Sequence, residues 1–310
     1  MNKAFIFPGQ GSQAIGMGKD LANNFPVAQK VFQTIDEALE QNLSHMIFEG
    51  PIEDLTMTEN TQPALMAVSM AFIEVIKDQT GKQIHELCDV VAGHSLGEYT
   101  ALCAAGAISI ADAARILRIR GKAMQNACPK GDGAMAAVLG MDIAKVEAIV
   151  AEANEHGICD VANDNNATQV VISGTVSAID FASAKVADLG GRAIKLNVSA
   201  PFHSRLIKSA ENVMRKALDE IEWSDPLVPV LANVTVQPTQ DIAQIKDNLV
   251  RQVSGRVRWR ETMEFLVANG VKELVEIGSG KVLTGMLRKV EHPFSLVNIG
   301  NLTEIEEWFK

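Results

Sequence analysis

The chain has 310 residues, a formal net charge of −10 and an apolar share of 47%. This length and composition are typical of a globular protein of one or two domains with a large core, and the acidic balance disfavours nucleic acid, whose recognition relies on basic surfaces. Without a run of about 18 apolar residues or a signal-peptide pattern before Pro8, the sequence also predicts no membrane span and a cytoplasmic location.

The predicted elements of residues 1–130 alternate as in an open α/β sheet. Hydrophobic patterning predicts a strand at 3–7, helices at 26–41 and 63–79, and a strand at 89–92. Pro63 is expected at the start of its helix, because proline has no N–H to lose in the first turn.

Residues 131–196 follow a different pattern from the segments on either side. The predicted order is strand, helix, strand, strand, helix, strand, at 134–139, 142–156, 160–163, 169–173, 176–189 and 192–196. A βαββαβ order is typical of a ferredoxin-like α+β unit. We therefore expect residues 131–196 to form a small subdomain that roofs a cleft.

The larger α/β pattern resumes after this insert. Helices are predicted at 200–221, 241–253 and 260–269, and strands at 228–232 and 272–277. The large domain is therefore expected to be discontinuous and to comprise residues 1–130 and 197–310.

The cysteines have no paired spacing, so we expect reduced, buried thiols and no metal site. They are Cys88, Cys103, Cys128 and Cys159.

The most informative segment begins with the strand at 89–92. It continues as Gly93-His94-Ser95-Leu96-Gly97 and then as a helix of small residues. This layout is typical of a nucleophile elbow, in which glycines two positions either side of a serine allow a strained turn that exposes the hydroxyl. It predicts acyl transfer with Ser95 as the nucleophile and the backbone N–H of Leu96 as one donor to the oxyanion.

Ser95 needs a base within hydrogen-bond reach, because a free serine hydroxyl is a poor nucleophile. His94 adjoins Ser95, but neighbours on a tight turn generally diverge. His203 follows Pro201-Phe202 where the chain re-enters the large domain, which makes it the stronger candidate. The remaining histidines lie in polar or helix-end settings and are expected at the surface. They are His45, His85, His156 and His292.

Arg120 is the residue that says most about the substrate. On a helix over 113–127, in which each position turns by about 100°, it shares an apolar face with Ile116, Leu117 and Met124. A buried arginine is costly without an anionic partner. Two readings stay open: a structural salt bridge to a buried carboxylate, or a bidentate clamp on a substrate carboxylate, for which the planar guanidinium is suited.

Two glycine-rich segments invite nucleotide-binding readings that we reject. Residues 9–14 fit a loose dinucleotide fingerprint. That fingerprint requires an acidic residue about 20 positions further on, at the end of a strand, whereas Asp36 lies in a helical pattern. Residues 278–281 lack the spacing of a phosphate-binding loop and are read as a strand-to-helix turn lining the cleft. Asn163, Asn165 and Asn166 could be turn residues of a hairpin.

Several motifs occur together and in order along nearly the whole chain. The chain resembles the malonyl-CoA:acyl carrier protein transacylases, which implies an α/β-hydrolase-like core with a mostly parallel sheet. The motifs are Phe5-Ile6-Phe7-Pro8-Gly9-Gln10-Gly11-Ser12-Gln13, Thr61-Gln62-Pro63, Gly93-His94-Ser95-Leu96-Gly97-Glu98, Arg120-Gly121-Lys122, Ala200-Pro201-Phe202-His203-Ser204, Val250-Arg251-Gln252 and Gly278-Ser279-Gly280-Lys281-Val282-Leu283.

The resemblance implies roles for individual residues. His203 matches the family's catalytic base, a backbone carbonyl near Gln252 would accept its other ring N–H, and no acidic residue completes the pair. The second oxyanion donor would be the backbone N–H of Gln10, and Arg120 would bind the malonyl carboxylate. The other residues implied at the substrate are Gln252, Asn163, Asn165, Phe202 and His94, of which Phe202 resembles the malonyl-selective pattern.

The function implied is a ping-pong transfer of malonyl from malonyl-CoA to acyl carrier protein for fatty acid synthesis, by a monomer without metal or redox cofactor. Three alternatives are a serine thioesterase or esterase, a trans-acting acyltransferase of polyketide synthesis, and a noncatalytic carrier-protein-binding module. Because the family's carrier protein is acidic, a basic patch is expected to dock it. The densest cluster of basic residues comprises Arg251, Arg256, Arg258 and Arg260. The alternative is that these arginines form a solvated face.

Overall fold

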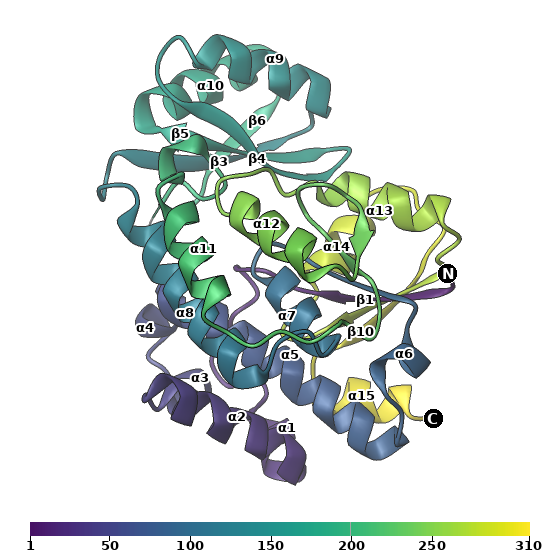
Figure 1. Ribbon diagram of the computed structural model, residues 1–310. Coiled ribbons are helices and arrows are strands. Elements are labelled where there is room, and N and C mark those ends of the chain that lie inside the picture. The colour runs from purple at the N-terminus through teal and green to yellow at the C-terminus, as the bar shows by residue number, and fades with distance from the viewer. Residues whose placement is uncertain (199) are drawn as a thin grey trace.

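The computed structural model describes residues 1–198 and 200–310 and contains two sheets, each with its own helices (Figure 1). The larger sheet has the strand order β10-β9-β1-β2-β7-β8 and is parallel except for the final pair. Its strands are β1 (Lys3–Phe7), β2 (Val90–Gly93), β7 (Val230–Leu231), β8 (Pro238–Thr239), β9 (Glu273–Ile277) and β10 (Ser295–Ile299). The predicted mostly parallel core sheet is confirmed.

Helices cover both faces of this sheet because its strands are apolar on both sides. The helices of the N-terminal two-fifths are α1 (Lys19–Asn24), α2 (Pro26–Leu39), α3 (Leu43–Glu49), α4 (Ile52–Thr56), α5 (Thr58–Thr80), α6 (Ile84–Leu87), α7 (Gly97–Ala104) and α8 (Ile110–Asn126). Those after the insert are α11 (Ala210–Asp219), α12 (Ile242–Gln252), α13 (Trp259–Ala268), α14 (Val282–Leu287) and α15 (Leu302–Trp308).

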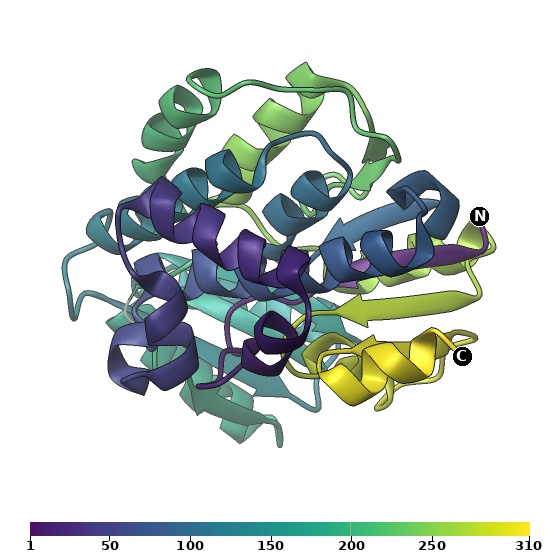
Figure 2. The ribbon, with the colours of Figure 1, turned by 90° about the horizontal axis from the view of Figure 1, so that it is seen from below.

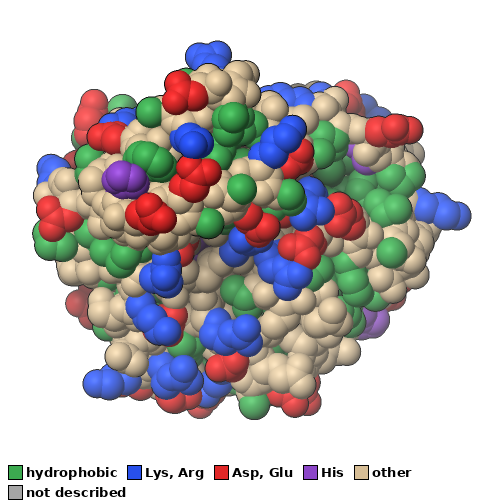
Figure 3. Space-filling model, turned by 90° about the horizontal axis from the view of Figure 1, so that it is seen from above, with side chains coloured by type: hydrophobic (Ala, Val, Ile, Leu, Met, Phe, Trp, Pro, Cys, Tyr) green, Lys and Arg blue, Asp and Glu red, His purple; other side chains and the backbone are tan. Residues whose placement is uncertain are grey.

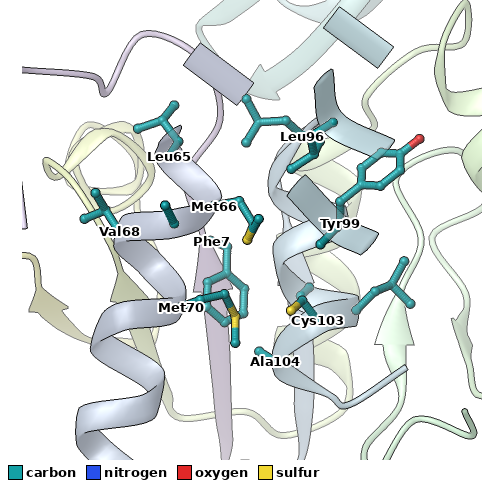
Figure 4. Close-up of a cluster of buried hydrophobic side chains, with 14 of the residues drawn as sticks. Phe7, Leu65, Met66, Val68, Met70, Leu96, Tyr99, Cys103 and Ala104 are labelled. Carbon is teal, nitrogen blue, oxygen red and sulfur yellow. The ribbon is translucent and has the colours of Figure 1, made fainter. Parts of the chain in front are cut away.

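Side-chain alternation along β1 shows how the two layers form. Phe5 and Phe7 belong to the core that includes α5 and α7, whereas Ala4 and Ile6 belong to the core that includes α13 and α14. In the close-up, Phe7 lies between the side chains of α5 and those of α7 (Figure 4). This packing fixes α7, and with it the turn that precedes α7, against the end of β1.

The smaller sheet has the order β4-β5-β3-β6, and its paired strands are antiparallel. Its elements follow the chain as β3 (Gly133–Leu139), α9 (Ile143–Ala153), β4 (Cys159–Asn166), β5 (Gln169–Thr175), α10 (Val176–Asp188) and β6 (Arg192–Lys195). The predicted ferredoxin-like order is therefore correct. This unit has a separate apolar core and lies at the opposite end of the molecule from the N-terminal helices (Figures 1 and 2).

Two predicted helices have the wrong bounds. α5 begins at Thr58 and contains Pro63, because Asn60 and Thr61 bond their side chains to the carbonyls of Asp54 and Leu55 and so anchor an earlier first turn. The helix predicted at 200–221 is confined to α11. The stretch before it contains only the 3-10 turn Arg205–Ile207, and His203 has a φ of +56°, which no helix accommodates.

All four cysteines are free and buried, as predicted. In the part of the chain that the structure describes, no helix is long and apolar enough to cross a membrane. Within the same residues, no group of three or more His, Cys, Asp or Glu side chains could hold a metal ion.

Candidate active site

Ser95 lies on a strained turn between β2 and α7. Its φ is +55°, in the left-handed region. A Cβ atom on Gly93 would lie 1.9 Å from the carbonyl carbon of Gly97, and one on Gly97 would lie 2.3 Å from the carbonyl oxygen of Phe7. Both positions therefore require glycine, and the turn has the geometry of a nucleophile elbow.

His203 is the histidine that reaches the serine. Its Nε2 lies 2.7 Å from Ser95 Oγ, and its Nδ1 lies 2.9 Å from the carbonyl oxygen of Gln252 and 3.1 Å from that of Gly255. Because carbonyl oxygens only accept, Nδ1 carries the proton and Nε2 is free to accept the serine proton. Burial, aided by the nearby Arg120 charge, lowers the pKa of His203 to about 3.

His94 is turned away from this pair. Its Nε2 lies 2.9 Å from Asn165 Oδ1, and its ring packs edge-on against Trp259. Burial lowers the pKa of His94, so the ring is neutral and donates its Nε2–H to the amide oxygen. The local geometry therefore favours His203 over His94 as the base.

Arg120 lies 1% exposed on the buried face of α8. Its NH2 donates to Ser95 Oγ at 3.1 Å and to Gln252 Oε1 at 2.8 Å, and its NH1 donates to Gln62 Oε1 at 2.8 Å. Among the described residues, no carboxylate forms an ion pair with it, and its buried Nε has no acceptor. The structural salt bridge that the sequence left open is absent there. On the opposite face of α8, Arg115 and Lys122 are exposed and Arg118 is partly buried.

A cavity of about 330 Å³ opens in front of Ser95. It lies at the carboxyl ends of β1 and β2, where open α/β sheets bind their ligands. Gln10, Leu96 and Arg120 line it from the large sheet's side, and Asn163 lines it from β4. Phe202 and His203 also line it. No hydrogen bond within the described residues uses the N–H of Gln10 or of Leu96.

Two residues and one turn that were expected at the cavity wall lie outside it. Gln252 is fully buried and contacts Arg120 and His203. Asn165 is likewise buried and contacts His94. The turn at 278–281 is outside the wall because Ser279 Oγ bonds to the carbonyl of Ser12 beneath the loop after β1. Asn163 and Asn165 lie within strand β4, whereas Asn166, the last residue of β4, accepts hydrogen bonds from Thr168 in the hairpin turn, as the turn interpretation expects.

Three further polar residues at the site were not predicted from the sequence. Gln62, within the motif Thr61-Gln62-Pro63, accepts a hydrogen bond from Arg120. Glu98 and Asn233 form a buried layer with Gln252 beneath the elbow. The available signal for Glu98 was a carboxylate within a helix of small and apolar residues, which is unusual in a core.

The arginine cluster predicted to dock a carrier protein is paired with acids. Arg256 contacts Glu147 at 2.7 Å, and Arg258 contacts Glu261. The other two pairs are Arg251 with Asp247 at 3.5 Å and Arg260 with Asp164 at 2.8 Å. On the face seen from above, Lys and Arg side chains lie among Asp and Glu over the upper part and gather with fewer acids toward the lower left (Figure 3).

Both the sequence and the structure are similar to known acyltransferases. Residues 4–296 match the acyl transferase domain family. Malonyl CoA-acyl carrier protein transacylase of Bacillus subtilis (strain 168) is 44% identical over 305 residues, covering 98% of this chain and 95% of the relative. The acyl-carrier-protein-S-malonyltransferase of Bartonella henselae is 52% identical, with a TM-score of 0.97 over 100% of this chain and 98% of that chain. A malonyl-transacylase solved in complex with a type II PKS acyl-carrier protein is 39% identical, with a TM-score of 0.94 over 99% of this chain and 98% of that one.

Proposed function

The chain belongs to the malonyl-CoA:acyl carrier protein transacylases, and from this premise we propose that Ser95 and His203 carry a malonyl group from malonyl-CoA to the phosphopantetheine thiol of an acyl carrier protein. The enzyme is an acyltransferase that supplies malonyl groups for fatty acid biosynthesis. The observation that carries the assignment of residues is the buried Arg120 guanidinium beside Ser95 Oγ, without a carboxylate partner among the described residues.

In the first half-reaction, His203 Nε2 takes the Ser95 proton as Oγ attacks the thioester carbon of malonyl-CoA. The backbone N–H groups of Gln10 and Leu96 stabilise the oxyanion. The C–S bond then breaks, and the proton on His203 passes to the coenzyme A sulfur. A malonyl-serine ester remains, and no metal or redox group takes part.

In the second half-reaction, the phosphopantetheine thiol gives its proton to His203 and its sulfur attacks the ester carbon. The bond from that carbon to Ser95 Oγ breaks, and Oγ recovers the proton. The backbone carbonyl of Gln252 keeps the imidazole tautomer correct without adding a negative charge. This suits a substrate that is itself an anion.

Arg120 selects the malonyl group in this proposal. Its guanidinium lies 3.1 Å from Ser95 Oγ, so an acyl group on that oxygen can direct its own carboxylate onto the guanidinium. The ion pair between the malonyl carboxylate and the guanidinium would be charge-assisted and shielded from water, which strengthens it. A thioesterase or esterase would need the elbow but no such arginine, and it would release the malonyl group to water without a carrier protein. Phe202 in the cavity wall is proposed to crowd an α-methyl substituent.

Replacing Arg120 by alanine should lower malonyl transfer much more than acetyl transfer. A charge-assisted hydrogen bond contributes about 1.5 to 3 kcal/mol, so the malonyl-to-acetyl ratio of kcat/KM should fall at least about tenfold. Both substrates are compared on the purified, folded variant, with Lys122→Ala on the exposed side of the same helix as the control. An unchanged ratio would remove the reason for assigning the carboxylate to Arg120.

The carrier protein is proposed to dock through residues of the arginine cluster. Arg251 is the best candidate for the docking residue, because its side chain is 54% exposed and its pair with Asp247 is long, at 3.5 Å.

A trans-acting acyltransferase of polyketide synthesis remains a second candidate function, since one structural relative was solved with a type II PKS acyl-carrier protein. Comparing fatty acid and polyketide carrier proteins as acceptors separates the two.

Salt should raise the KM for the carrier protein, because long-range steering weakens as ionic strength increases. Reversing Arg251 to glutamate should raise that KM more than reversing Arg258, whose charge is already compensated by Glu261. Steady-state kinetics at low and high salt measure both effects. If neither salt nor Arg251→Glu changes the KM, the carrier protein docks elsewhere.

We further propose that residues 1–130 and 197–310 act as one discontinuous domain and residues 131–196 as another. Residues 131–196 have an apolar core of their own, which supports this division, while Met135, Ala137, Ala162 and Val171 of the same unit pack into the core of the large domain. A cytoplasmic location and a monomeric state remain predictions. Sedimentation of the purified protein tests the second.

A further inference from the structure

Glu98 is a buried carboxylate that the proposed reaction does not use. It lies in the first turn of α7 and is 2% exposed. Its Oε2 accepts hydrogen bonds from Gln252 Nε2 at 2.8 Å and from the backbone N–H of Asn233 at 3.0 Å. No Lys, Arg or His among the described residues forms an ion pair with it. Burial raises the pKa of Glu98 to about 7. Burying a carboxylate without a cationic partner costs free energy of folding, which its hydrogen bonds only partly offset, so a role for Glu98 in the site has to be sought.

The first of these bonds is one of two that set which way the Gln252 amide faces. Its Nε2 donates both to Glu98 and to the carbonyl oxygen of Ser95, at 2.9 Å, while its Oε1 accepts from Arg120 NH2. Turned through a half rotation, the amide would place its oxygen against two acceptors and its NH2 group against the guanidinium. Glu98, together with the carbonyl oxygen of Ser95, therefore keeps the amide oxygen directed at Arg120.

The second bond supports the elbow itself. Asn233 follows β7 and bridges the turn, because its Oδ1 accepts from the N–H of Ser95 at 2.8 Å and its Nδ2 donates to the carbonyl of Gly93 at 2.7 Å. Glu98 holds the backbone of this bridging residue. One carboxylate thus contacts both residues that anchor the arginine and the serine from behind.

We propose that Glu98 is a positioning residue for malonyl selection. It acts through the side-chain amide of Gln252, whose oxygen orients Arg120 toward an acyl group on Ser95. This inference rests on the proposed function, in which Arg120 binds the malonyl carboxylate. Glu98 touches neither the substrate nor the imidazole, so its loss should alter substrate preference more than the basic acyl-transfer chemistry.

Two substitutions at Glu98 separate its hydrogen-bond role from its volume. Glu98→Met keeps the length of the side chain but has no oxygen acceptor, whereas Glu98→Gln keeps an oxygen for Gln252 and Asn233. We expect Glu98→Met to lower the malonyl-to-acetyl ratio of kcat/KM by about fivefold or more, the effect of one hydrogen bond. Glu98→Gln should stay within about twofold of the wild type. Leu102→Ala, fully buried on the same helix and outside this layer, controls for loss of stability and should leave the ratio unchanged.

A double-mutant cycle with Gln252→Met tests the route from Glu98 to Arg120. That substitution leaves the backbone carbonyl that orients His203. If Glu98 acts through the Gln252 amide, Glu98→Met adds no further change in ratio to Gln252→Met. This comparison also serves if Glu98→Met alone does not fold, because replacing both partners by apolar groups leaves fewer unpaired polar atoms.

Three results would overturn the inference. One is a folded Glu98→Met enzyme with the wild-type ratio, another is an equal loss in Glu98→Gln and Glu98→Met, and the third is an additive cycle. These results differ from those expected if the proposed function itself is wrong. If the proposed function is wrong, the wild type forms no malonyl adduct on Ser95, or Arg120→Ala leaves the malonyl-to-acetyl ratio unchanged.

Discussion

Replacing Ser95 by alanine should abolish the covalent malonyl adduct that the enzyme forms with malonyl-CoA. Ser95 Oγ is the oxygen that lies 2.7 Å from His203 Nε2, and the strained elbow exposes it to the cavity. No neighbouring hydroxyl on the turn can take its place, because the adjoining positions are His94 and Leu96. Intact-protein mass after mixing with malonyl-CoA measures the adduct directly.

A second hydroxyl in the same cavity provides a matched control. Thr56 lines the cavity but forms no hydrogen bond with His203 within the described residues, so Thr56→Ala should still become malonylated. Adding carrier protein to the wild type should remove the adduct. Persistence of the adduct in Ser95→Ala would show that another residue is the nucleophile.

The elbow and the arginine could be predicted because their evidence is local in the sequence. Glycines two positions either side of Ser95 indicate a turn without space for side chains, and the close approach of Gly97 to Phe7 supplies the physical reason. Arg120 stood out because helical periodicity places it on an apolar stripe. In both cases one short segment contains the whole signal.

The layer behind the site could not be predicted in this way. Gln62, Glu98, Asn233 and Gln252 come from four separate elements or loops, and only the folded chain brings them together around Arg120 and the elbow. The conformation of His203 is another such case. Its φ is positive and its ring is bonded to the carbonyls of Gln252 and Gly255 from a distant segment, neither of which local propensity contains, so a helix was wrongly extended through it.

Replacing His203 by alanine should slow malonylation of Ser95 by roughly 10²- to 10⁴-fold, the usual effect of losing a general base. The fold should be retained, and the Arg120 contacts with Gln62 and Gln252 do not involve the imidazole. Rapid-quench measurement of adduct formation gives the rate. His94→Ala is the comparison, because His94 bonds to Asn165 instead of Ser95. A larger loss in His94→Ala than in His203→Ala would reverse the assignment of the base.

The same base predicts an unusual pH dependence. An ordinary histidine, with a pKa near 6.5, would lose about tenfold in neutral form for each pH unit below that value. Because burial and the Arg120 charge hold the pKa of His203 at about 3, its imidazole stays neutral and able to accept a proton well below pH 6.5. The malonylation rate at subsaturating malonyl-CoA, which reports on the free enzyme, should therefore change less than about threefold between about pH 7 and pH 5. The measurement is made on Glu98→Gln as well as on the wild type, because the Glu98 carboxyl has a pKa of about 7 and could add a titration of its own. A tenfold fall per unit that persists in Glu98→Gln would mean that the base titrates as an ordinary histidine, contrary to the buried dyad.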